Sequence, residues 1–154
     1  MRLTLALGLG AFLALPAPAR AQEVPKDVQE LLVTLKSEKA PERAAAARIL
    51  GELGPAAKDA VPGLQEALLD ADKDVRRSAA RSLGDVGRPA QPAVPALGKA
   101  LKDGDAAVRQ AAAYALGRIG DPAAKPFLEA AKKDTNEGVK RAAKDALKAL
   151  KKKA

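Results

Sequence analysis

A repeat of 33 residues is the feature that most constrains the fold of this chain. At that offset, residue types recur three times. The recurring sets are Val28/Val61/Val94, Leu31/Leu64/Leu97, Leu35/Leu68/Leu101, Arg43/Arg76/Arg109, Ala46/Ala79/Ala112, Leu50/Leu83/Leu116, Gly51/Gly84/Gly117 and Gly54/Gly87/Gly120. A fourth, looser unit follows at an offset of 31, with Pro126, Leu128, Asp134, Val139, Lys140, Ala143, Leu147 and Leu150. A period of 20–50 residues is typical of solenoids.

Each unit contains two stretches with helical periodicity. In the second unit, Val61-Pro62 predicts the start of a first helix, because proline is tolerated at the first helical position. A second helix is expected over 74–86, capped by Asp72 or Asp74. Gly87 follows its last turn, where a left-handed residue is favoured. No strand-like alternation occurs in the sequence, so we predict an all-α fold.

The predicted architecture is an α-solenoid of about four helical hairpins. The repeat domain covers residues 27–150, preceded by a short segment over 22–26 and followed by a basic tail over 151–154. The expected units are 27–60, 61–93, 94–124 and 125–150.

The N-terminus has the three-part pattern of a secretory signal peptide. Met1-Arg2 is positive, residues 3–15 are apolar and uncharged, and Ala19-Arg20-Ala21 supplies the small residues of a cleavage site. The predicted signal therefore covers 1–21, and the mature chain begins at Gln22. The apolar run is shorter than the roughly 20 residues that span a membrane, so we expect no transmembrane segment after cleavage. The expected location is the periplasm or the exterior of the cell.

The composition excludes several kinds of site. The chain has no His, Cys or Trp, and only one Tyr and two Phe. Zinc, copper, haem and iron–sulfur sites draw mainly on imidazole and thiolate ligands, and the Ser-His-Asp and Cys-His catalytic arrangements also require them. We therefore predict no catalytic, metal or cofactor-binding residues. The few aromatic residues argue against a nucleic-acid stacking platform.

The strings VPGLQEALLDADKDVRRSAARSLGDVG (61–87) and VPALGKALKDGDAAVRQAAAYALGRIG (94–120) resemble HEAT repeats, in particular the short bacterial phycobilisome-lyase HEAT-like repeats. This resemblance implies a ladder between adjacent repeats, formed by an Asp before the second helix and an Arg six residues later. Asp70, Arg76, Asp103 and Arg109 match that pattern. Asp134/Lys140 is a weaker version, and Ser37/Arg43 departs from it.

The resemblance also brings two enzyme precedents. One is a hydroxylase that holds two irons through His-Glu pairs, for which this chain has no histidine ligand. The other is the bilin lyases, which are usually larger and work as paired subunits. Neither precedent has a recognisable site in this sequence, so a non-enzymatic role is expected.

A net basic stripe runs along the second helices. Arg77, Arg81 and Asp85 lie opposite the apolar face of the helix over 74–86. In the family, this side lines the concave binding surface. The candidate partner-binding residues are Arg48, Arg77, Arg81, Gln110, Tyr114, Arg118 and Arg141. Tyr114 is expected at an outward position that needs no packing role, with the Arg81 guanidinium able to lie over its ring.

The predicted function is that of an exported scaffold that binds an acidic or polar protein partner. One alternative is binding of an anionic polymer or membrane surface through the basic face, or through the lysines near the C-terminus; nucleic acid is disfavoured. Another alternative is a lyase-type enzyme subunit. An ordinary solvated face would explain the same stripe without any partner.

Overall fold

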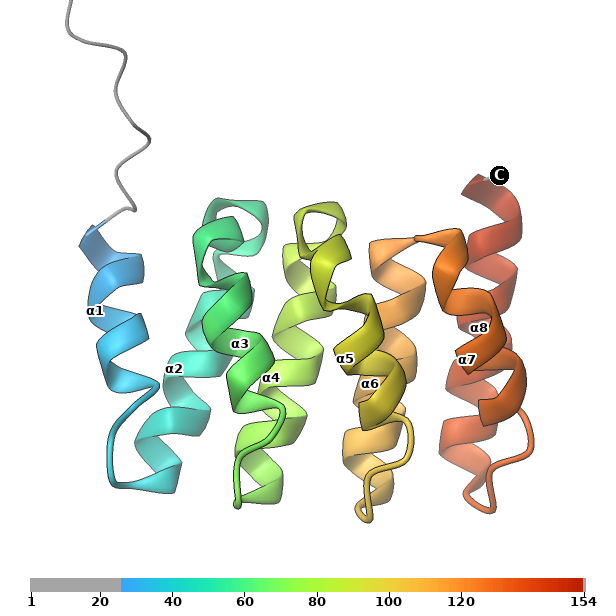
Figure 1. Cartoon of the computed structure of the whole chain (residues 1–154), viewed down its shortest axis with the longest axis horizontal. Helices are drawn as coiled ribbons and strands as arrows, with labels where there is room; N and C mark the ends of the chain where they lie inside the picture. The colour runs from blue at the N-terminus through green and yellow to red at the C-terminus, as the bar shows by residue number, and fades with distance from the viewer. Residues whose placement is uncertain (1–25, 154) are drawn as a thin grey trace, which may run out of the picture.

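The computed structural model describes residues 26–153, which form four helical hairpins placed side by side (Figure 1). The predicted signal peptide and its cleavage site lie outside the described residues. The first helices of the hairpins, here called A helices, are α1 (Lys26–Thr34), α3 (Val61–Ala67), α5 (Val94–Ala100) and α7 (Lys125–Ala131). The second, or B, helices are α2 (Ala40–Glu52), α4 (Lys73–Val86), α6 (Ala106–Ile119) and α8 (Glu137–Lys153).

The predicted all-α solenoid is confirmed. The A helices and the B helices form two layers, and each B helix packs against the B helices of the neighbouring hairpins (Figure 1). No strand occurs within residues 26–153. In the same part of the chain, no helix combines the length and the apolar character needed to cross a membrane.

Side-chain caps begin the B helices of the last three hairpins. Asp72 accepts hydrogen bonds from the backbone N–H groups of Asp74 and Val75, which decides between the two caps that the sequence allowed. Asp105 and Asn136 do the same for α6 and α8. Such caps satisfy N–H groups that have no partner inside the helix.

The segments between hairpins are 3-10 helices that the sequence analysis did not predict: η1 (Gly54–Ala60), η2 (Arg88–Ala93) and η3 (Pro122–Ala124). Gly54, Gly87 and Gly120 mark the turns into them with positive φ. Gly120 adopts the left-handed helical conformation, whereas Gly87, with φ 76° and ψ −139°, does not. The left-handed residue expected at Gly87 is therefore a different conformation, although one that still requires glycine.

Two predicted boundaries also differ. Lys26, assigned to the short N-terminal segment, begins α1, and Lys151 to Lys153, assigned to a tail, continue α8. The last described helix therefore has 17 residues.

One continuous core runs through all four hairpins. Its large side chains are leucines and valines that share repeat positions, such as Leu50, Leu83 and Leu116, all fully buried. Alanine and glycine fill the contacts between B helices. A Cβ added at Gly84 would lie 2.7 Å from the Cα of Ala115, and one at Gly117 would lie 2.8 Å from the Cα of Ala146. The small residues thus set the close spacing of the B layer.

Candidate functional site along the B helices

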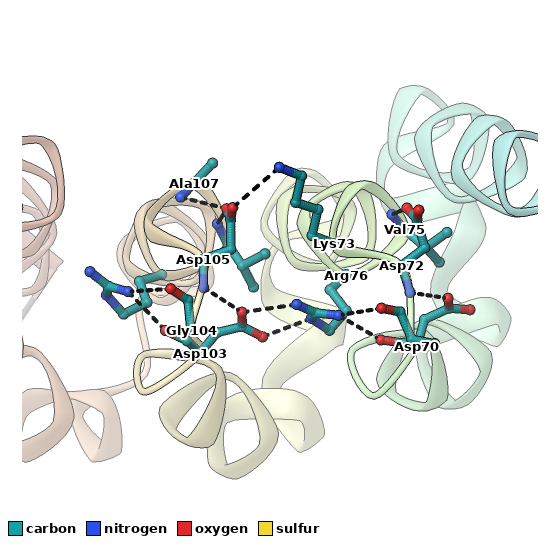
Figure 2. A network of polar contacts seen from close by, with 12 residues as sticks. Asp70, Asp72, Lys73, Val75, Arg76, Asp103, Gly104, Asp105 and Ala107 are labelled. Atoms are coloured by element: carbon teal, nitrogen blue, oxygen red, sulfur yellow. Dashed lines mark hydrogen bonds and ion pairs between the residues drawn. The ribbon is translucent and has the colours of Figure 1, made fainter.

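An ion-pair ladder joins the repeats beside the turns between A and B helices (Figure 2). Each rung joins an arginine of one repeat to an aspartate of the next, through Nε at 2.7–2.8 Å and Nη2 at 2.9–3.1 Å. The rungs are Arg43–Asp70, Arg76–Asp103 and Arg109–Asp134. Their side chains are only 11–20% exposed. Two parallel bonds per rung fix both the distance and the orientation between neighbouring hairpins.

The structure clarifies how the ladder residues pair. Within its own repeat, Arg76 donates through Nη1 to the backbone carbonyl of Asp70 at 2.8 Å, while its carboxylate partner, Asp103, lies 27 residues away (Figure 2). Arg43 forms a complete rung, although Ser37 replaces the aspartate of its own unit. Lys140, in the last repeat that the structure describes, pairs with Glu137 of the same helix.

The ladder lowers the pKa of its carboxyl groups. Hydrogen bonds from Arg43 hold the pKa of Asp70 below its ordinary value, and Arg109 does the same for Asp134. Burial works to raise the pKa of Asp103, but the hydrogen bonds from Arg76 and from the backbone of Asp105 outweigh it and lower that pKa too.

We expect a pH-dependent loss of stability on Asp103→Asn. The pKa of Asp103 is lower in the folded chain than in the unfolded chain, so its contribution is complete above about pH 5 and declines as the pH falls through about 4 and below. At pH 7 the substitution should lower the free energy of unfolding by on the order of 1 kcal/mol.

Urea unfolding of the wild type and the variant between pH 2 and pH 7 measures this difference. Glu66→Gln, which neutralises an exposed carboxylate on α3, is the control and should have little effect at any pH. A difference for Asp103→Asn that stays constant down to pH 2 would contradict the role given to the ladder.

A groove of about 930 Å³ runs along the B helices. We call it the B-helix groove. Its polar lining consists of Arg48, Glu52, Arg77, Ser78, Arg81, Ser82, Asp85, Gln110, Tyr114, Arg118, Arg141 and Asp145. All seven residues that the sequence singled out as partner-binding candidates are among them. They come from four different helices, and the stacking of the repeats brings them to one surface.

A cluster of interacting side chains surrounds Tyr114 in the B-helix groove. The Tyr114 hydroxyl donates to Asp85 Oδ1 at 2.9 Å, and the Arg81 guanidinium carbon lies 5.1 Å from the centre of its ring. Arg81 also pairs with Asp85 at 3.9 Å. Burial, and then the hydrogen bond to Asp85, raise the pKa of Tyr114. A phenol is already protonated at neutral pH, so Tyr114 is a hydrogen-bond donor there, and the shift extends this to more alkaline solution.

One expectation for Tyr114 is wrong. The sequence analysis expected an outward position that needs no packing role. Tyr114 does line the groove, but its ring is part-buried, and its Cε1 lies 3.2 Å from the point that a Cβ on Gly84 would occupy. Sequence reasoning also missed Asp85 as the partner of Tyr114. The two are 29 residues apart, and only stacking of adjacent repeats brings them together.

The charge of the groove is net positive. Five arginines and three carboxylates line it. Each carboxylate has a basic neighbour: Glu52 pairs with Arg48, Asp85 with Arg81, and Asp145 with Lys148 at 4.0 Å. Arg77 pairs in turn with Asp74 at 3.1 Å beside the groove. The lining thus carries more basic than acidic groups, which favours negatively charged partners.

The described residues show no sign of a metal centre. Within residues 26–153, no group of three or more His, Cys, Asp or Glu side chains is placed to hold an ion. In the same range, every buried side-chain nitrogen or oxygen has a hydrogen-bond partner; Ser82, for example, donates to the carbonyl of Ala47 at 2.6 Å.

The fold and the B-helix groove define an α-solenoid repeat protein. The HEAT-repeat model matches residues 28–93 and 70–148, which together cover most of the chain. The chain belongs to the HEAT-repeat family. No curated protein matches it significantly in sequence.

Solved structures with the same architecture include both enzymes and binding proteins. The CpcE–CpcF complex of phycocyanin lyase from Nostoc sp. PCC7120 is 32% identical, with a TM-score of 0.69 over 81% of this chain and 53% of that chain. Human deoxyhypusine hydroxylase is 30% identical, with a TM-score of 0.67 over 81% and 43%. A designed armadillo repeat protein in complex with the peptide (KR)4 is 20% identical, with a TM-score of 0.68 over 80% and 64%, and shows the fold alone. This chain thus spans about two fifths to two thirds of the length of these structures.

Proposed function

We propose that this protein is an exported, non-enzymatic scaffold that binds an acidic or polar protein segment in the B-helix groove. The cluster of Arg81, Tyr114 and Asp85 carries the proposal. It holds a large aromatic side chain and a guanidinium in fixed positions on the groove surface. Preorganised aromatic and arginine side chains are the usual anchors of protein interfaces.

The mechanism is rigid presentation. The ladder and the glycine–alanine contacts fix neighbouring B helices, so groove side chains from different repeats keep their spacing without a partner. Binding of a partner then does not have to immobilise the groove side chains, which lowers the entropy cost of binding. The positive surplus steers negatively charged segments toward the groove, at a rate that falls with salt.

Export is proposed from the signal-peptide pattern of residues 1–21. N-terminal sequencing of the protein recovered from outside the cytoplasm should begin at Gln22. Recovery of the intact chain from Met1 in the cytoplasm would contradict export.

We expect Tyr114→Ala and Arg81→Ala to weaken partner binding by more than about 1 kcal/mol each, or about fivefold, because each removes an anchor of the groove. Three fluorescent twelve-residue peptides, acidic, neutral polar and basic, are titrated against the mature chain from Gln22. Affinity should fall in that order. Arg88→Ala, an exposed arginine on η2 outside the groove lining, should leave binding unchanged.

Two results would overturn this assignment. One is unchanged affinity in both groove variants, and the other is a basic peptide that binds as tightly as the acidic one. A steep salt dependence without selectivity among anionic probes would favour the alternative of a polymer-binding face. Thermal melts of each variant separate lost binding from lost folding.

A further inference from the structure

The outer edge of α8 carries a row of lysines that no other B helix has. Lys140, Lys144, Lys148 and Lys151 are spaced at i, i+4, i+8 and i+11, which places them along one side of the helix over about 16 Å. Lys144, Lys148 and Lys151 are exposed, and Lys140 is half-buried beside Glu137. We call these four residues the lysine edge.

The repeat shows what this edge does in the inner hairpins. At the position of Lys144 the preceding B helices have buried alanines (Ala47, Ala80, Ala113), and at that of Lys148 they have the glycines that the next B helix packs on (Gly51, Gly84, Gly117). Within residues 26–153, α8 is the last helix, and no further B helix covers this side of it (Figure 1). Any polar residue would keep this end soluble, the negative pole of the helix dipole favours a lysine at position 151, and Lys140 pairs with Glu137. The exposed lysines at 144 and 148 need a further reason.

Exposed carboxylates lie at the opposite end of the array. Asp27 and Glu30 in α1 and Glu42 in α2 are exposed. They occupy the repeat positions that are filled in the second hairpin by Ala60, Gly63 and Val75. Glu42 pairs with Lys39 at 3.1 Å, and Lys36 and Lys39 are exposed in the same hairpin. The first hairpin is therefore mixed in charge, whereas lysine predominates on the exposed side of α8.

We propose that the lysine edge docks the protein, last hairpin first, on an anionic lipid surface. Charge complementarity carries the proposal: the exposed ammonium groups of Lys144, Lys148 and Lys151 lie in one row, with the half-buried Lys140 at its beginning, and such a row attracts a negatively charged surface. All four are lysines, which act as point charges and suit a plane of headgroups rather than one shaped ligand. The edge carries no aromatic residue for stacking on bases.

A second copy of the chain fits the edge less well. In the inner contacts Gly51 meets Ser82 and Gly84 meets Ala115, so in a continued stack Lys148 would meet the equivalent residue of the next copy, Ile49. Lys144 would similarly meet the region of Ala45. Both contacts would bury an ammonium group against an apolar side chain, which is unfavourable without a partner of opposite charge.

The docking would leave the B-helix groove open. Arg141, Asp145 and Ala149 of α8 line the groove, whereas none of the four lysines of the edge does. The edge is next to the groove on α8, and Lys148 pairs with Asp145 at 4.0 Å. The inference thus goes beyond the proposed function and can fail independently of it.

The test is sedimentation of the mature chain with vesicles of phosphatidylglycerol and phosphatidylcholine, compared with phosphatidylcholine alone. The variant Lys144→Gln/Lys148→Gln/Lys151→Gln should bind the anionic vesicles about 100-fold more weakly, since each lysine near such a surface contributes about fivefold. The matched control, Lys36→Gln/Lys99→Gln/Lys102→Gln, removes the same charge at exposed positions elsewhere and should lose less than about fivefold. Arg81→Ala should bind vesicles as the wild type does.

Several results would overturn the proposal. Equal losses in the two triple variants would mean that net charge alone drives binding. Absence of vesicle binding by the wild type would exclude an anionic lipid surface as the partner of the lysine edge. Tighter binding to a duplex oligonucleotide than to the vesicles, lost in the edge variant, would assign the edge to nucleic acid. Self-association in analytical ultracentrifugation that the edge variant abolishes would assign it to a second copy.

Discussion

Leu83→Ala is expected to lower the free energy of unfolding by about 2–4 kcal/mol, as truncation of a fully buried leucine does. Leu83 has no exposed surface and lies in α4, which packs against α2 on one side and α6 on the other. Because hairpins are stabilised mainly by their nearest neighbours, loosening an inner one weakens two contacts at once. The remaining hairpins should unfold with it in a single transition.

Leu69→Ala is the matched control, because Leu69 is 84% exposed and the chemical change is identical. It should change stability by less than about 0.5 kcal/mol. Thermal and urea unfolding followed by circular dichroism measure both variants. Equal losses at the two positions would show that the core is wrongly assigned. So would a larger loss in Arg76→Ala, which breaks one rung of the ladder and should cost on the order of 1 kcal/mol.

Gly84→Ala is expected to destabilise the protein by about 1–2 kcal/mol, even though alanine is the better helix former by up to about 1 kcal/mol. The added Cβ would lie 2.7 Å from the Cα of Ala115 and 3.1 Å from its Cβ. A backbone atom cannot avoid the clash by changing rotamer, so α4 and α6 would have to move apart. The steric effect should therefore outweigh the gain in helix propensity.

Gly104→Ala provides the comparison, because a Cβ there meets nothing within 4 Å and φ at that turn is not positive. This variant should be neutral or slightly stabilising. Equilibrium unfolding of both variants tests the difference. A stabilised Gly84→Ala would mean that α4 and α6 do not approach as closely as described.

Much of the fold could be predicted from the sequence, because the same local sequence signals recur in each repeat. The period of 33, the proline at the start of α3 and the cap of α4 are local signals, and each acts within a few residues. The residues that line the B-helix groove could also be predicted from the sequence. Positions opposite the apolar face of one B helix had to line up with the same positions in the next.

The pairings across repeats did not follow from local signals. The ladder was implied only by the family resemblance, in which Arg76 meets an aspartate of the next repeat, 27 residues away, and nothing in the sequence indicated that Tyr114 meets Asp85, 29 residues away. These distances depend on how far the hairpins slide and rotate when they stack. The burial of the Tyr114 ring, the 3-10 connections and the conformation of Gly87 depend on the same packing.

The sequence by itself therefore determined the class of fold, the number of hairpins and the residues that face the B-helix groove, since these follow from periodicity and local propensity. Only the tertiary structure decided which charges meet, how closely the B helices approach and what remains uncovered at the two ends. The physical reason is that ion pairs and close-packed contacts act over a few ångströms. They are defined only once stacking has brought distant parts of the chain into register.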